Sequence, residues 1–162
     1  MGQGMMFIAW AILLAMLFFY FREHQAEQFN PNREFESVII DGRTTVQLRA
    51  NKQNHFLSSG KINNQAVVFL VDTGATNVAL SEKLARRLKL PAGYPSLVET
   101  ANGSVKVYST TIDQLQIGEI TLYDVSAQIN PGMNNMDEIL LGMSALSRVE
   151  FSQRDGILTL RQ

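Results

Sequence analysis

The sequence predicts an all-β domain that contains one short helix and is preceded by a single transmembrane helix. An unbroken apolar segment occupies residues 5–21. From residue 37 onward, short stretches of alternating apolar and polar residues are separated by turn dipeptides. Only residues 82–90 show clear helical spacing. Strands this numerous around so little helix are typical of a compact, barrel-like domain.

Residues 5–21 contain no charged or strongly polar side chain, and a helix of this length spans roughly 25 Å, the short end of what crosses a bilayer. A cleaved signal peptide would have a basic start and a small-residue cleavage site, and residues 22–28 offer no convincing site. A core helix would have a polar face, and this segment has none. We therefore expect residues 1–21 to be an uncleaved anchor, embedded in the lipid bilayer through residues 5–21.

Residues 22–50 are predicted to be a juxtamembrane linker with a candidate first strand. The linker part, residues 22–36, is polar and contains Asn-Pro-Asn at residues 30–32. Val46, Leu48 and Ala50 then alternate with polar residues, as in a strand with one buried face. Residues 51–162 are the predicted soluble domain.

Turn dipeptides mark the hairpins of the soluble domain. Asn-Gly and Asp-Gly pairs favour type I′ turns, in which both central residues have positive φ. The candidate turns are Asp41-Gly42, Asn63-Asn64, Asn102-Gly103 and Asp155-Gly156. The one predicted helix follows Ser81, a suitable N-cap, and ends before Pro91. A shorter helical turn is expected over residues 143–147.

Composition excludes several kinds of chemistry. The chain has no cysteine, which rules out disulfides, thiolate catalysis and cysteine metal ligands. Its two histidines, His24 and His55, lie far apart without a neighbouring cluster of ligands, so no metal site is expected. A net charge of −1 gives no electrostatic reason to bind nucleic acid.

One segment carries the residues of a candidate active site. Residues 67–71 form an apolar run, predicted to be a buried strand, that ends in Asp72, Thr73 and Gly74. A buried carboxylate costs free energy unless partners or function compensate for it, and Gly74 permits a tight loop. The alternative is an ordinary hairpin turn. A second apolar strand near the C-terminus also leads into a glycine, Gly142.

These two segments, Asp72-Thr73-Gly74-Ala75-Thr76 and Leu140-Leu141-Gly142, resemble the signature segments of retropepsin-like aspartic proteases. The resemblance is stronger still to a bacterial subgroup with an N-terminal transmembrane helix, and it covers about residues 50–162. It includes His55-Phe56, the helix around Leu84, residues 100–103 and the closing segment 156–160. The chain departs from the pattern mainly at Lys89, where glycine is more usual. The fold implied is a retropepsin-like closed barrel.

The resemblance also implies roles for individual residues. Asp72 would be the catalytic carboxylate, Thr73 would hold the loop against a second copy, and Gly74 would contact substrate through its backbone. The implied active-site loop is Thr73, Gly74 and Ala75, and the implied structural loop is Leu141 and Gly142.

A flap is implied as well, in the form of a mobile hairpin that closes over bound peptide. Its tip would consist of Ala101, Asn102 and Gly103. The residues support this assignment independently, because an Asn-Gly turn followed by alternating valines builds a protruding ribbon. The substrate would be an extended polypeptide, and no cofactor is implied.

Aspartic protease chemistry needs two carboxylates that share one proton across an attacking water. The chain has a single Asp-Thr-Gly segment, while Asp113, Asp124 and Asp137 lie in polar settings. We therefore expect a homodimer in which the second carboxylate is Asp72 of another copy. The segment 157–160 is the candidate interface edge, by analogy with the terminal strands of the family.

Two criteria disagree about the side of the membrane. Arg22 and Arg33 follow the apolar segment, so the positive-inside rule would keep the domain in the cytoplasm. The bacterial subgroup implies a single-pass protein of the inner membrane with the protease domain facing the periplasm. Because two arginines are a weak signal, we expect the protease domain to face the periplasm.

The predicted function is a membrane-anchored aspartic endopeptidase in which the two Asp72 carboxylates of a homodimer activate water. The alternative is a non-catalytic, membrane-tethered binding or sensory domain on the same fold, which would not require an acid at the end of an apolar strand. A serine hydrolase is a weaker alternative. The residues around Ser144 lack the second glycine of a nucleophile elbow, and His55 has no evident partner.

Overall fold

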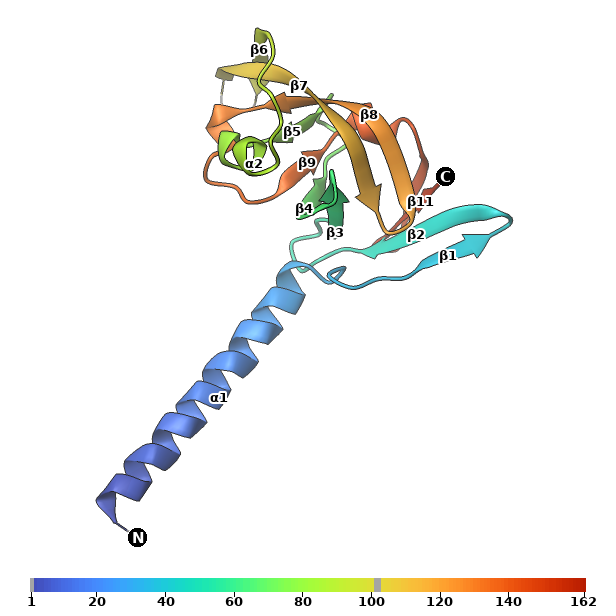
Figure 1. The fold of residues 1–162 in the computed structure, drawn as a ribbon. Helices are drawn as coiled ribbons and strands as arrows, with labels where there is room; N and C mark the ends of the chain where they lie inside the picture. The colour runs from blue at the N-terminus through green and yellow to red at the C-terminus, as the bar shows by residue number, and fades with distance from the viewer. Residues whose placement is uncertain (1, 101–102) are drawn as a thin grey trace.

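The computed structural model describes residues 2–100 and 103–162. Within these residues the chain forms one long helix, α1 (Gln3–Phe29), followed by eleven strands, two short α-helices and one 3-10 turn. Figure 1 shows α1 as a straight rod that leaves the β-rich domain, with the N-terminus at its far end. A mainly β fold behind a single apolar helix confirms the predicted fold class.

The helix α1 is longer than the predicted anchor. It continues past Phe21 to Phe29, because residues 22–28 (REHQAEQ) are mostly good helix formers. Its apolar part is long and apolar enough to cross a membrane, and none of that part is buried inside the protein. The core-helix alternative is therefore excluded, whereas an N-terminal signal sequence has the same length and composition. Residues 22–29, expected to be part of the linker, are therefore helical.

The rest of the predicted linker lies against the domain. Residues 30–36 are irregular, but Asn30 and Asn32 are buried. Two strands follow where one was expected, β1 (Ser37–Ile40) and β2 (Arg43–Arg49). They pair antiparallel through the Asp41-Gly42 turn, in which φ is 53° and 76°. The ordered domain therefore begins at about residue 30 rather than at residue 51.

A four-stranded antiparallel sheet joins the two ends of the domain. Its order is β1-β2-β11-β10, and the Asp155-Gly156 turn connects β10 (Glu150–Arg154) to β11 (Ile157–Arg161). β11 lies between β2 and β10, so the prediction that residues 157–160 form an interface edge is wrong. The free edges of this sheet are β1 and β10. Edge position depends on the order of strands in space, which the local sequence of β11 does not encode.

The second sheet has seven strands in the order β3-β4-β9-β5-β8-β7-β6. Their bounds are β3 (Leu57–Ile62), β4 (Gln65–Val71), β5 (Val78–Leu80), β6 (Pro95–Thr100), β7 (Gly103–Ile117), β8 (Ile120–Ile129) and β9 (Ile139–Leu141). A further pairing of Lys61 and Ile62 in β3 with Gln116 and Leu115 in β7 joins the two ends of a six-stranded ring. This closure by two residue pairs is broadly consistent with the predicted barrel.

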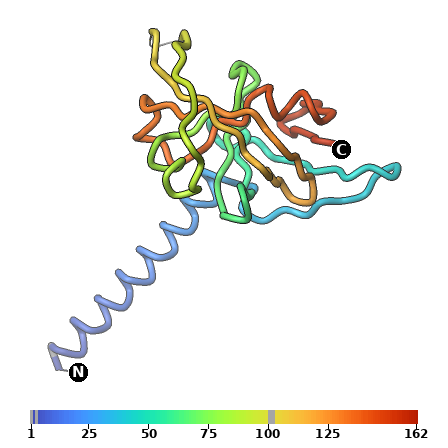
Figure 2. The backbone as a smooth tube through the Cα atoms, turned by 45° about the horizontal axis from the view of Figure 1, so that its top comes forward, coloured from blue at the N-terminus to red at the C-terminus, as the bar shows by residue number. Residues whose placement is uncertain are grey.

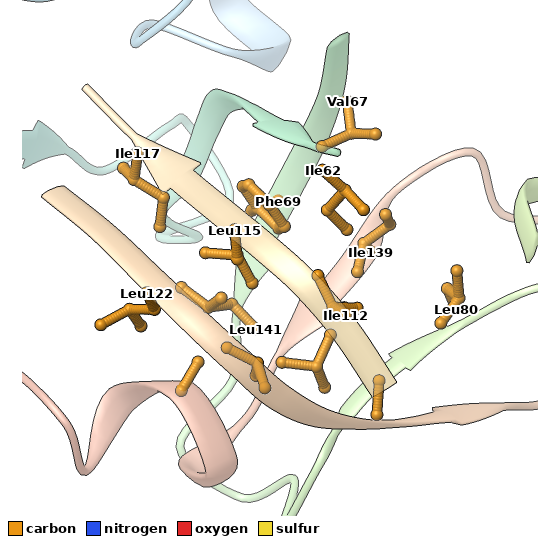
Figure 3. Close-up of a cluster of buried hydrophobic side chains, with 14 of the residues drawn as sticks. Ile62, Val67, Phe69, Leu80, Ile112, Leu115, Ile117, Leu122, Ile139 and Leu141 are labelled. Atoms are coloured by element: carbon orange, nitrogen blue, oxygen red, sulfur yellow. The ribbon is translucent and has the colours of Figure 1, made fainter. Parts of the chain in front are cut away.

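Apolar side chains from alternate positions of these strands fill the ring. Figure 3 shows Phe69 of β4, Ile112 and Leu115 of β7 and Ile139 of β9 pointing toward one another. All four are completely buried. Burial of a side chain of this size contributes roughly 1.5–3 kcal/mol relative to its exposure. The strand that leads to Asp72 is thus held in the core by one face, which carries Val67 and Phe69, while the other face is only partly buried.

The predicted helix is present as α2 (Glu82–Arg87). The Ser81 hydroxyl accepts a hydrogen bond from the Leu84 amide at 3.3 Å, and Glu82 pairs with Arg86 at 3.9 Å. Lys89 then adopts a φ of 57° just after the helix, where a glycine is usual. The second short helix, α3 (Met143–Leu146), agrees with the expected turn after Gly142.

The hairpin of β6 and β7 projects from the ring. Figure 2 shows it standing away from α1, on the far side of the domain. Its pairing runs from Pro95 with Tyr108 to Thr100 with Gly103. Two residues of the predicted flap tip, Ala101 and Asn102, lie outside the described residues. Gly103 begins β7 with a φ of 103°, a conformation that favours glycine.

Candidate active site

Two neighbouring parallel strands place the two signature segments side by side. β4 pairs with β9 in parallel, with Val71 opposite Leu141. Asp72 is the first residue after β4, and its amide donates to the Leu141 carbonyl at 3.2 Å. Because the carboxyl ends of parallel strands lie at the same edge, Asp72 and Gly142 are brought together there.

The carboxylate of Asp72 is held by its own loop. Its Oδ1 atom accepts a hydrogen bond from the Gly74 amide at 2.9 Å, and the Asp72 carbonyl accepts one from the Ala75 amide at 3.2 Å. The side chain is partly exposed. Among the described residues Oδ2 has no hydrogen-bond partner and no cation pairs with the carboxylate. One oxygen is thus fixed, while the other is free to bind water or an approaching group.

Gly142 allows the second segment to support this loop. A Cβ atom at this position would lie 2.3 Å from the Asn77 carbonyl oxygen and 2.7 Å from that of Ala75. In this close approach the Met143 amide donates to the Ala75 carbonyl at 2.8 Å, and the Ser144 amide donates to the Thr76 carbonyl at 2.9 Å. The start of α3 therefore fixes the backbone of the Asp72 loop.

The Ser144 hydroxyl makes two hydrogen bonds to the main chain. The Oγ atom accepts a hydrogen bond from the Val78 amide at 2.9 Å and donates one to the Ser126 carbonyl at 2.7 Å. A nucleophilic serine needs a base to receive its proton. Here the proton is directed at a main-chain carbonyl, which argues against the serine hydrolase alternative.

A groove of about 750 Å³ opens beside the Asp72 loop. The loop forms one part of its lining, through Asp72, Gly74, Ala75 and Thr76. The remaining lining comes from Asn77 and Ala79, just after the loop, and from residues farther away in the sequence: Val98, Glu99, Gln128, Asn130, Met133 and Leu140. A groove of this volume accommodates several side chains of an extended peptide.

Sequence reasoning marked Leu140 but missed the lining residues of β6, of β8 and of the 3-10 turn that follows β8. Val98 and Glu99 belong to β6, Gln128 belongs to β8, and Met133 ends the 3-10 turn η1 (Pro131–Met133). No motif marks them, because they meet only when the hairpin folds back beside β8. The predicted loop residue Thr73 is exposed, and its hydroxyl has no partner among the described residues.

A second hollow, of about 370 Å³, lies on another side of Asp72. It is lined by the loop before β3, which includes His55 and Phe56, and by Phe151, Ser152 and Gln153 of β10. The Val71 amide donates to the Phe56 carbonyl at 2.9 Å, which fixes this loop to the end of β4. The free edge of the small sheet is therefore adjacent to the carboxylate.

Asp137 is an aspartate whose environment is different. The hydrogen bond and charge of Lys83, whose Nζ lies 2.9 Å from Oδ1, hold the pKa of the Asp137 carboxyl below its usual value near 3.8. Asp137 is fully exposed. It is therefore a surface ion pair, unlike the partly exposed carboxylate of Asp72 at the groove. Over the described residues there is no group of three acidic or histidine side chains placed to bind a metal.

Two parallel strands bring an Asp-Thr-Gly loop and a Leu-Leu-Gly segment to one edge of the large sheet. This arrangement defines the class of the retropepsin-like aspartic proteases. The model of the family described as gag-polyprotein putative aspartyl protease matches residues 58–148, so the chain belongs to this family. The retropepsin-like prediction is confirmed.

Relatives and solved structures agree with this membership. A Sinorhizobium protein, described as an uncharacterized protein in the cobV 5′ region, is 30% identical over 94% of this chain and 70% of its own length. An uncharacterized Rickettsia prowazekii protein is 33% identical over 58% of this chain and 41% of its own length. The crystal structure of a retropepsin-like aspartic protease from Rickettsia conorii superposes with a TM-score of 0.62 at 29% identity, covering 72% of this chain and 98% of that one.

Proposed function

We propose that this chain is a membrane-anchored aspartic endopeptidase whose active centre consists of Asp72 from two copies. The observation that carries the proposal is the carboxylate itself. Asp72 lies at the edge of a peptide-sized groove, with Oδ1 held by the Gly74 amide and Oδ2 without a partner among the described residues. A rigid carboxylate with one free oxygen is suited to hold an attacking water.

The proposed reaction divides two proton transfers between two carboxylates. One carboxylate removes a proton from water, and the other donates a proton to the carbonyl oxygen of the scissile peptide. Glu99 is the other carboxylate that lines the groove, but it lies exposed on β6 and its Oε1 accepts a hydrogen bond from the Ser104 hydroxyl. Glu99 is therefore a poor candidate for the second role. We assign this role to Asp72 of a partner subunit.

The free edge of β10 offers a docking site for that partner. All five residues of β10 are exposed, and three of them line the hollow next to Asp72. An antiparallel pairing of β10 with its own copy, centred on Ser152, would place Glu150 opposite Arg154 of the partner subunit. The sequence of the strand, EFSQR, is thus complementary to itself in charge.

The membrane anchor is the part of α1 that is apolar and unburied. We propose that it holds the protein in a bacterial inner membrane with the protease domain in the periplasm. The bacterial origin of the relatives supports the host, and the resemblance to the subgroup supports the side. Two copies confined to one membrane meet more often than two copies in solution, which favours the homodimer.

The substitution Asp72→Asn tests the proposed chemistry. Asn keeps the shape and the hydrogen bond from Gly74 but cannot transfer the proton, so peptide cleavage should fall by roughly a thousandfold or more. The measurements are cleavage of a peptide library by the purified full-length protein and its sedimentation in detergent. Lost cleavage with an unchanged dimer supports the enzyme. Unchanged cleavage would refute the role of Asp72, and absence of cleavage in the wild type would favour the non-catalytic alternative.

A further inference from the structure

We infer that the anchor and the protease domain form one rigid unit, which restricts cleavage to polypeptides presented at a fixed height above the same membrane. This inference rests on the proposed function and adds a substrate class to it. The substrates would be membrane-anchored proteins whose scissile bond lies within a narrow range of distances from the bilayer.

The first part of the rigid unit is a helical stalk. α1 continues without interruption from its apolar part through the mostly polar residues 22–29. At 1.5 Å per residue this polar part is about 12 Å long. Figure 1 shows it reaching the base of the β-rich domain as a straight extension of the apolar part. The domain is therefore held away from the end of the apolar segment by a stiff rod.

The second part is a strap of residues 29–37 that fixes the stalk to the domain. At its centre lies Asn32, which is 3% exposed. Its Nδ2 atom donates to the carbonyls of Arg49 at 2.9 Å and Leu57 at 2.6 Å. Its Oδ1 atom accepts from the Arg49 amide at 2.7 Å. This one side chain thus joins the strap to β2 and β3, and a buried amide with all these bonds is costly to release.

Contacts on both sides of Asn32 extend the attachment. The Asn51 side chain donates to the Phe29 carbonyl, at the last residue of α1, at 3.1 Å. The Ser37 hydroxyl, at the other end of the strap, accepts from the Glu119 amide at 2.9 Å. Attachment at three separated points leaves the strap no freedom to act as a hinge.

The same contacts connect the stalk to the region of Asp72. The Asn51 side chain that binds the end of α1 also accepts hydrogen bonds from the amides of Gln53 and His55, each at 2.9 Å. His55 lines the 370 Å³ hollow together with Asp72. The position of the carboxylate relative to the anchor is therefore fixed through a short chain of contacts.

A flexible tether would behave differently. If residues 30–36, between α1 and β1, were a flexible chain, these seven residues would have an end-to-end distance of roughly 15 Å and would sample all directions. The domain could then reach substrates at many heights. The strap removes this range. The groove is lined in part by Val98 and Glu99 of β6, and Figure 2 shows that the β6–β7 hairpin lies on the side of the domain away from α1. A scissile bond directly at the bilayer surface is therefore out of reach, and one farther out is favoured.

The test uses the full-length protein in liposomes with a series of anchored model substrates. Each substrate carries the same cleavable peptide on a transmembrane helix, separated by a helical spacer of graded length. Three forms are compared: wild type, a variant with seven helical residues inserted after Gln25, and a variant with a twelve-residue Gly-Ser insertion after Gln28. The second insertion leaves Phe29 and the whole strap in place, so the domain keeps its fold. A soluble form of the peptide is the control substrate.

Wild type should cleave best at one spacer length and at least tenfold less well when the spacer is about ten residues shorter or longer. The seven-residue insertion adds two turns to the stalk and should move this optimum outward by about seven spacer residues, since stalk and spacer are both helical and rise equally per residue. The Gly-Ser insertion should flatten the profile. All three forms should cleave the soluble peptide equally. A flat wild-type profile with intact peptide cleavage would overturn the rigid unit, whereas loss of peptide cleavage in all forms would refute the protease itself.

Discussion

At the scale of single residues, the candidate site depends on Gly142 as much as on Asp72. Asp72 supplies the carboxylate, but the backbone of its loop is held by amides that follow Gly142. The two residues are 70 positions apart in the chain and adjacent in space. Gly74 is the other glycine of this edge: its amide donates to Oδ1, and a Cβ added there would lie 3.2 Å from that same oxygen.

Gly142→Ala should therefore destabilise the protein and reduce cleavage. The added Cβ would lie 2.3 Å from the Asn77 carbonyl oxygen, a backbone atom that cannot move away cheaply. We expect a loss of about 2–3 kcal/mol in the free energy of unfolding. Urea unfolding of the full-length protein in detergent measures it. Gly132→Ala is the matched control, because its Cβ would approach side-chain atoms and no backbone: Asn130 Oδ1 at 3.1 Å and Val105 Cγ1 at 3.7 Å. Equal losses in the two variants would contradict the argument.

At the scale of elements, the end of α2 is the clearest local strain. The Leu90 amide donates to the Ala85 carbonyl at 2.9 Å, and this C-terminal cap requires Lys89 to have a φ of 57°. A lysine in this conformation places its Cβ close to the next carbonyl oxygen. The sequence comparison with the protease family already marks this position as one where glycine is more usual.

Lys89→Gly should stabilise the protein by about 1 kcal/mol, because glycine has no Cβ to clash in this conformation. The change appears as a higher urea midpoint with an unchanged slope. Lys89→Ala removes the same charge but keeps the Cβ, so it should give no such gain. A similar gain from both substitutions would mean that charge, and not backbone conformation, matters at this position.

At the scale of the whole molecule, two features decide the proposed function: the free edge at β10 and the attachment of α1. The small sheet ends at β10 beside the hollow that contains Asp72. Glu150 already pairs with Arg43 at 2.6 Å and Arg161 at 3.9 Å within its own chain. A partner's Arg154 would join this network of charges rather than form an isolated pair.

Arg154→Glu should weaken the homodimer. Each of the two symmetric contacts would then bring two glutamates together, and we expect the dimer dissociation constant to rise by about tenfold or more. Sedimentation at several protein concentrations measures it, and cleavage should fall in parallel at low concentration. Combining this change with Glu150→Arg should restore part of the affinity. An unaffected dimer would show that the copies meet elsewhere.

Features that depend on neighbours in the chain were predictable. The Asp41-Gly42, Asn63-Asn64 and Asp155-Gly156 pairs all have positive φ at both residues, as their turn chemistry requires. Ser81 caps α2 because its hydroxyl reaches an amide three residues ahead. Asp72 was marked by an apolar strand that ends abruptly in a carboxylate and a glycine.

Features that depend on distant partners were missed or wrong. Residues 22–29 read as linker because an exposed polar helix has no apolar face to reveal it. Asn32 looked like a turn residue, and only folding supplies the carbonyls that bury it. The candidate interface edge was assigned to β11, whereas β10 is the free edge of the small sheet. The sequence could not reveal this, because the order of strands in a sheet depends on pairing between distant segments.

The sequence by itself determined the apolar helix, the strands and turns of the domain, and the loop that carries Asp72. Each follows from interactions within a few residues, such as apolar periodicity, capping and permitted φ. Only the tertiary structure decided which groove the carboxylate borders, which edge is free for a second copy, and how the stalk is held. These depend on hydrogen bonds and packing between segments far apart in the chain, whose pairing no local pattern specifies.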